Sequence, residues 1–129
     1  MPPIENLQRV PLYHLEALGR QGIFTTGLLL EVSETSTRRQ YLADQISADI
    51  TDVNDWRDEA LLLNLANFGP TEQALFTQAG IIGLSDLLAS DSDEFRSRLT
   101  RASRALGTEP PTDLIIDGWY EQAHTLAEE

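Results

Sequence analysis

The stretch Phe68-Gly69-Pro70-Thr71-Glu72-Gln73-Ala74-Leu75-Phe76-Thr77-Gln78-Ala79-Gly80-Ile81 predicts a tight turn, a short helix and a glycine stop. Gly69-Pro70 supplies the turn, because proline suits the first position of a helix. Gly80 fits the left-handed position that follows a helix end, since glycine has no Cβ to clash there. The same order occurs earlier in the chain, from Val10-Pro11-Leu12 to Gly22-Ile23.

This order is used twice, which indicates an internal duplication. Gly22 and Gly80 lie 58 positions apart, whereas Trp56 and Trp119 lie 63 positions apart. The second half therefore carries about five extra residues, which we place around 107–111. We expect that neither half alone could bury its apolar face well. We expect a first repeat over residues 1–66 and a second over residues 67–129, packed as one compact pseudo-symmetric body.

The rest of the chain favours an all-α fold of about eight to ten short helices. Apolar residues recur at helical spacing, and no alternating strand pattern of useful length is present. Residues 1–6 read as a loose lead-in, followed by a short helical turn over 7–10. The side chains that we expect to point inward on the later helices are Tyr41, Leu42, Val53, Trp56, Ala60, Leu63, Phe95, Leu99, Ala102, Leu106, Ile115, Trp119, Ala123 and Leu126.

Composition restricts the classes of partner. The 129 residues hold 21 acidic and nine basic residues, for a net charge of −12, and every basic residue is an arginine. Such a chain repels nucleic-acid backbones and anionic membranes, so we expect another protein as the partner. The first residues lack a basic region followed by an apolar run, and no apolar run is long enough to cross a bilayer. We therefore expect a cytoplasmic protein.

The sequence offers no recognisable chemistry. Cysteine is absent, which excludes disulfides and thiolate ligands, and the absence of lysine excludes a lysine Schiff base. His14 and His124 are the only histidines, and neither has a second ligand at metal spacing, so we expect both on exposed or half-buried helix faces. No Gly-rich phosphate loop and no nucleophile–base pair is visible. We therefore expect no catalytic residue, no metal and no cofactor.

Two groups of residues remain as candidates for function. The helix over about 93–106 holds four of the nine arginines, and Arg98, Arg101 and Arg104 extend from the flank of its apolar stripe to the far side. One interpretation is a solvated face that pairs with nearby acids, for example Glu94 with Arg98. The other is a docking surface for an acidic or phosphate-bearing partner. Trp56, Trp119, Gly22 and Gly80 are instead predicted to be structural anchors.

The turn, the short helix that ends in Gly22-Ile23 or Gly80-Ile81, and the following Leu-Leu helix resemble the helix-hairpin-helix module. Over residues 7–126 the chain is similar to a family of tandem helix-hairpin-helix-like proteins known only as a domain of unknown function. Its members tend to show this order twice, each time with a later Trp-x-x-x-Ala helix, as in Trp56-x-x-x-Ala60 and Trp119-x-x-x-Ala123.

The wider helix-hairpin-helix class implies phosphate binding through a Gly-hydrophobic-Gly hairpin that presents backbone N–H groups. Here the first hairpin is Val10-Pro11-Leu12, without glycine, and the second is Phe68-Gly69-Pro70, in which proline removes an N–H. The leading hypothesis is therefore a non-enzymatic adaptor or assembly factor that binds protein. The alternatives are a nucleic-acid-associated protein that uses the second hairpin and the Arg96–Arg104 helix face, and a small-ligand binder or enzyme with a cleft between the repeats.

Overall fold

A computed structural model describes residues 2–127, and across this range every regular element is helical and no β-strand occurs. The predicted all-α class is confirmed. The chain divides into two compact units, Met1–Asn64 and Leu65–Glu129, close to the division that we predict after residue 66. The packing of the two halves as one pseudo-symmetric body stays a prediction. No helix in the described range is long and apolar enough to span a bilayer.

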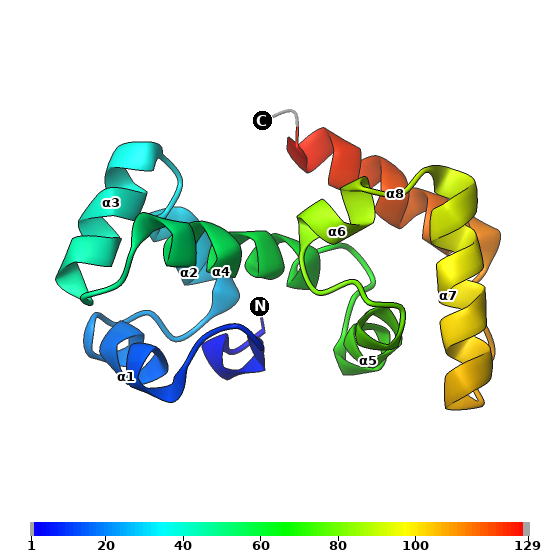
Figure 1. The fold of residues 1–129 in the computed structure, drawn as a ribbon, viewed down its shortest axis with the longest axis horizontal. Helices are drawn as coiled ribbons and strands as arrows, with labels where there is room; N and C mark the ends of the chain where they lie inside the picture. Colours follow the sequence, from blue (N-terminus) through cyan, green and yellow to red (C-terminus); the bar gives the residue numbers. More distant parts are fainter. Residues whose placement is uncertain (1, 128–129) are drawn as a thin grey trace. The chain divides into compact units, whose positions relative to one another are not determined.

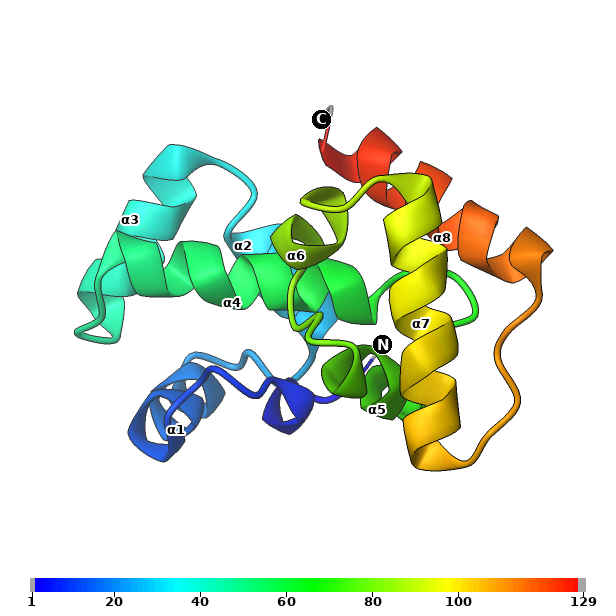
Figure 2. The ribbon, with the colours of Figure 1, turned by 45° about the vertical axis from the view of Figure 1, so that its right-hand side comes forward.

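The first unit is built around its last helix (Figure 1), with α2 and α3 packed against α4. Its elements are η1 Ile4–Asn6, α1 Leu12–Arg20, α2 Thr26–Val32, α3 Ser36–Gln45 and α4 Ile50–Leu63. In the second unit α7 lies beside α5 and α8 (Figure 2), and α6 also contacts α8. The elements of this unit are α5 Pro70–Gln78, α6 Leu84–Leu88, α7 Ser92–Leu106 and α8 Asp113–Ala127.

The first residues are held in place, so the predicted loose lead-in is wrong for the part of it that the structure describes. Ile4 is buried, and its N–H donates to the carbonyl of Phe24 over 2.9 Å. The helical turn lies at Ile4–Asn6 rather than over 7–10. The buried carboxylate of Glu59 on α4 accepts hydrogen bonds from the N–H groups of Gln8, at 2.5 Å, and Arg9, at 3.1 Å. A side chain of α4 therefore accepts two backbone N–H groups of the segment that joins η1 to α1.

The core of the second unit is aromatic. Trp119 on α8 is buried, as a core position requires, and its ring centroid lies 5.1 Å from that of Phe76 and 6.3 Å from that of Phe68. Phe76 in turn packs edge-on against Phe95 of α7. The indole N–H of Trp119 donates to the carbonyl of Ala66 over 2.8 Å. This bond ties α8 to the turn that precedes α5, and edge-to-face packing of the rings stabilises the cluster.

The Gly-Ile step has the predicted geometry in both units. Gly22 and Gly80 have φ values of 80° and 78°, the left-handed conformation that favours glycine. After each glycine, an isoleucine N–H bonds back into the helix, to Leu18 in the first unit and Phe76 in the second. These bonds lie at the same 58-residue offset, measure 2.9 and 2.8 Å, and close each helix in the same way.

Some of the predicted core positions are wrong. Tyr41 is 67% exposed, whereas Leu42 and Ala43 are buried. Consecutive residues of a helix point in directions about 100° apart, so these three side chains cannot all face α4. Leu106 is 43% exposed and Ile115 is 37% exposed. Both lie where α7 ends and α8 begins, beside the extra residues of the second half. Helical spacing places them correctly on the apolar face, but near a helix end that face has no neighbour to cover it.

Substituting Gly22 tests the left-handed step. We expect Gly22→Ala to lower the free energy of unfolding by about 1–2 kcal/mol, the cost of this conformation for a residue with Cβ. Gly118 is the matched control, because it lies inside α8 and a Cβ there would meet no atom within 4 Å. Gly118→Ala should raise stability by about 0.5–1 kcal/mol through helix propensity. Urea unfolding followed by circular dichroism measures both, and equal effects of the two changes would contradict the assignment.

The buried carboxyl of Glu59 predicts how the free energy of unfolding depends on pH. Burial raises the pKa of its carboxyl above the usual 4.5, against the lowering effect of the Gln8 and Arg9 N–H groups and the Arg9 charge. With the higher pKa, the folded state binds more protons than the unfolded state between the two values, so this group's contribution to stability falls as pH rises through that interval. Glu59→Gln removes the titration. We expect the unfolding free energy of the native chain, relative to Glu59→Gln, to fall as pH rises from 4.5.

Urea unfolding at a series of pH values gives this difference directly. Glu16→Gln is the control, since Glu16 is exposed on α1. A difference that rises with pH would mean that the hydrogen bonds to the ionised carboxylate outweigh its burial.

Candidate functional site

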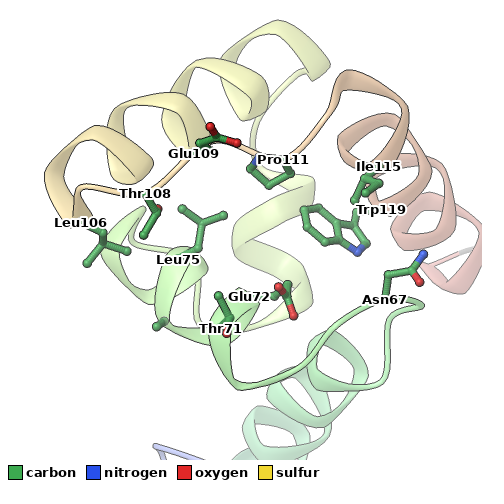
Figure 3. Close-up of a pocket in the computed structure, with 11 residues that line it drawn as sticks. Asn67, Thr71, Glu72, Leu75, Leu106, Thr108, Glu109, Pro111, Ile115 and Trp119 are labelled. Carbon is green, nitrogen blue, oxygen red and sulfur yellow. The ribbon is translucent and has the colours of Figure 1, made fainter.

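The second unit contains a pocket of about 530 Å³ between α5, the segment that joins α7 to α8, and α8 itself (Figure 3). The buried side chains of Leu75 and Trp119 point toward one another across it. The partly exposed Leu106, Pro111 and Ile115 complete the apolar wall. A cavity of this volume is in the range that takes a small ligand or one or two large side chains.

The polar lining of the pocket is acidic or neutral. It consists of Asn67, Thr71, Glu72, Thr108 and Glu109. Glu72 is partly committed, because its Oε1 accepts the N–H of Gly69 over 2.9 Å. Glu109 makes no hydrogen bond or ion pair with any residue of the described range. The pocket therefore presents the unpaired carboxylate of Glu109. It also presents Oε2 of Glu72, which has no partner among the described residues.

The second hairpin, Phe68-Gly69-Pro70, does not present a phosphate cradle. The N–H of Gly69 is occupied by the Glu72 carboxylate, which places a negative charge where an anion would bind. Phe68 is half-buried, and its ring packs edge-on against Phe76 at 4.9 Å. At the first hairpin, Pro11 has no N–H, and Leu12 and Tyr13 after it are exposed apolar residues. The first hairpin therefore lacks an N–H at Pro11, and in the second the N–H of Gly69 is taken by Glu72, so each offers fewer amides to a phosphate than a Gly-hydrophobic-Gly hairpin would.

The arginines predicted as a docking surface separate into two kinds. Arg98 turns inward: its Nη2 and Nε donate to the carbonyl of Ala79 over 2.7 and 3.2 Å, and its Nη1 donates to Ser90 Oγ over 2.9 Å. The predicted Glu94–Arg98 pair is therefore wrong. The acceptors are at the end of α5, where the partial negative charge of the helix favours a cation. Arg101 and Arg104 are exposed, and their side chains make no hydrogen bond or ion pair with the described residues.

Arg96, which is on α7 like Arg98, forms a bidentate ion pair with Asp117. Arg96 bonds Asp117 of α8 through Nε at 3.0 Å and Nη2 at 2.5 Å. The hydrogen bonds that Arg96 donates to the Asp117 carboxylate, and the negative charge of that carboxylate, raise the pKa of Arg96. This pair joins α7 to α8, so of the four arginines between 96 and 104, two serve the fold and two face solvent.

The two histidines, His14 and His124, do not form a set of metal ligands with other described residues. His124 is exposed, whereas His14 is 4% exposed, which corrects the expected exposed or half-buried position. The His14 ring packs between Tyr13 and Trp56, with centroids at 4.1 and 5.0 Å, and neither ring nitrogen has a described partner. Among residues 2–127 no three histidine or carboxylate side chains are grouped to hold a metal ion.

A family model described as a domain of unknown function, DUF4332, matches residues 13–126. The chain belongs to this family. Neither the curated proteins nor the solved structures contain a significant match to it. The prediction of a family without an assigned function is therefore confirmed for the DUF4332 chain.

The sequence misses the pocket of the DUF4332 chain for an identifiable reason. Leu106 and Ile115 follow a helical stripe, and periodicity predicts them to be buried. The signal that does point to the pocket is the difference between the two offsets, 58 and 63, from which the extra residues are predicted to lie around 107–111. Thr108, Glu109 and Pro111 of that segment form one side of the pocket.

The inward-facing and the solvent-facing arginines of the DUF4332 chain should contribute differently to stability. We expect Arg98→Ala to lower the free energy of unfolding by about 1–3 kcal/mol, because the carbonyl of Ala79 loses a charged donor. Arg101→Ala should change it by less than about 0.5 kcal/mol, as is usual for an exposed position. Chemical unfolding of both variants checks this, and a neutral Arg98→Ala would show that water replaces the guanidinium at no cost.

Proposed function

We propose that the chain is a non-enzymatic, cytoplasmic adaptor or assembly factor that binds another protein and is built on two degenerate helix-hairpin-helix-like repeats. The pocket of the second unit carries the proposal. Its rim exposes Leu106 and Ile115, and the adjacent Leu114 is 84% exposed. Exposed apolar side chains around a concave site are typical of surfaces that a partner covers.

Contacts inside each unit support the two-repeat part of the proposal. In the first unit the Glu59 carboxylate accepts the N–H of Gln8, and in the second the Gln122 carboxamide accepts the N–H of Ala66 over 2.9 Å. The donors differ by 58 positions and the acceptors by 63, the two offsets found in the sequence. The same backbone contact is therefore made at matching positions, once by a glutamate and once by a glutamine.

The nature of the pocket favours binding over catalysis. Its hydroxyl groups belong to Thr71 and Thr108, and the lining includes no histidine, cysteine or lysine that could take a proton from them. An enzyme or a small-ligand binder with a cleft between the repeats remains the alternative of a different class. It would rely on Glu72 or Glu109 as the base, and neither carboxylate bonds the hydroxyl of Thr71 or Thr108.

The nucleic-acid alternative has less support than protein binding. It relies on Gly69 and on the face from Arg96 to Arg104. The Gly69 N–H already bonds Glu72, and Arg98 already bonds Ala79. Arg101 and Arg104 are left, and two cations give little of the phosphate neutralisation on which such binding depends.

Site-specific crosslinking tests the proposal. A photoreactive p-benzoylphenylalanine in place of Leu114 lies beside the pocket without replacing a lining residue. In native lysate treated with nuclease, we expect a discrete protein adduct that disappears when Leu106→Ser and Ile115→Ser are added. The control places the same group at Phe24, which is 58% exposed in the first unit.

Each outcome has a distinct meaning. An identical adduct from both positions, or one that survives the pocket substitutions, would contradict binding at this pocket. An adduct that requires intact nucleic acid would favour the nucleic-acid alternative.

A further inference from the structure

The pocket of the second unit has a charge as well as a shape, and the charge restricts its occupant. No arginine is among its lining residues, although α7 holds four of them. Two of these, Arg96 and Arg98, are bonded to Asp117 and Ala79. The acids of the lining, Glu72 and Glu109, have no cationic partner in the described range.

We infer that the pocket takes a short basic segment of a partner protein, in which one bulky apolar side chain is flanked by arginine or lysine. This inference depends on the proposed protein-binding function and specifies the chemistry of the partner. The apolar side chain enters between Leu75, Ile115 and Trp119. The flanking cations meet Glu72 on α5 and Glu109 on the 107–112 segment, which line the same pocket from different elements.

The shape and the charge both favour this class of occupant. A pocket of about 530 Å³ exceeds one leucine side chain, so an aromatic residue or a pair of aliphatic residues fills it. Arginine and lysine have apolar stems that cover surfaces such as Leu106 while the charged group reaches a carboxylate. The net charge of −12 also raises the rate at which a basic segment encounters the chain. An acidic segment would bring its carboxylates against unpaired ones.

Glu72 has a second property that suits this role. Its Oε1 is fixed by the N–H of Gly69, so the carboxylate is oriented before a partner arrives. An oriented acceptor loses less side-chain entropy on binding than a freely rotating one. Glu109 lies in the 107–112 segment and has no such support, so we expect Glu72 to contribute more specificity and Glu109 more long-range attraction.

The test uses synthetic fluorescent peptides with the full-length protein. The peptides share their length and a central Phe-Leu pair, and differ only in flanks of arginine, glutamine or glutamate. Fluorescence polarisation measures binding at low and at physiological salt. We expect the arginine-flanked peptide to bind at least about tenfold more tightly than the glutamate-flanked one, and the difference to shrink as salt screens the carboxylates.

Paired variants separate a local site from the general acidity of the chain. Glu72→Gln with Glu109→Gln keeps a side-chain acceptor for Gly69 and removes two charges. Glu16→Gln with Glu121→Gln removes two charges from exposed positions elsewhere. We expect the first pair to weaken the arginine-flanked peptide by about three- to tenfold, without affecting the glutamine-flanked one, and the second pair to have little effect.

Three results would overturn the inference: equal affinity for basic and acidic flanks, equal weakening by the two pairs of variants, or no binding of the basic peptide. The comparison of peptides uses the unaltered chain, so it holds even where a variant fails to fold. The proposed function is decided separately by the Leu114 crosslink. A pocket-dependent adduct together with equal peptide affinities would keep protein binding and reject the basic partner.

Discussion

The structure depends on satisfying the ends of short helices. The α-helices of residues 2–127 are between five and fifteen residues long, so unpaired end groups form a large share of their backbone. Acids in the first turns accept the free N–H groups at the N-terminal ends, as Glu72 does for Gly69 and Asp86 does for Ile82 and Gly83. Arginines serve the opposite ends. Helices of this length are marginal alone, so these side chains and the buried tryptophans make the fold possible.

This use of charge explains the distribution of arginine. Arg39 and Arg57 donate to the carbonyls of Ser33 and Leu30 at the end of α2, and Arg98 does the same at the end of α5. A forked guanidinium bonds two acceptors at once, which a lysine ammonium does less well, and the chain contains no lysine. Burial at this position lowers the pKa of Arg57. Several of the nine arginines are used inside the fold, and with 21 acids the chain keeps a net charge of −12.

Features that follow from backbone conformation and from the spacing of apolar residues are predicted well from the sequence. Contacts between residues that are distant along the chain are predicted poorly. The glycine steps at Gly22 and Gly80 follow from the need for positive φ, and the all-α class follows from helical spacing. Arg98 could not be placed, because its acceptor at Ala79 is nineteen residues away along the chain and belongs to another helix. Leu106 and Ile115 carry the pattern of buried residues, and only the path of the segment between them shows that they border a pocket. His14 is similar, since nothing in its local sequence places it against Trp56.

The two units differ at the positions that correspond to part of the pocket lining in the second unit. At the 58-residue offset, Thr71 and Glu72 correspond to Tyr13 and His14, and the His14 ring packs against the rings of Tyr13 and Trp56 in the first unit. In the second unit a hydroxyl and a carboxylate replace two rings, which leaves space beside Trp119. Thr108, Glu109 and Pro111, from the segment between α7 and α8, line that space. The second unit therefore has an apolar pocket with acidic edges at the positions where the first unit has His14 packed against Trp56.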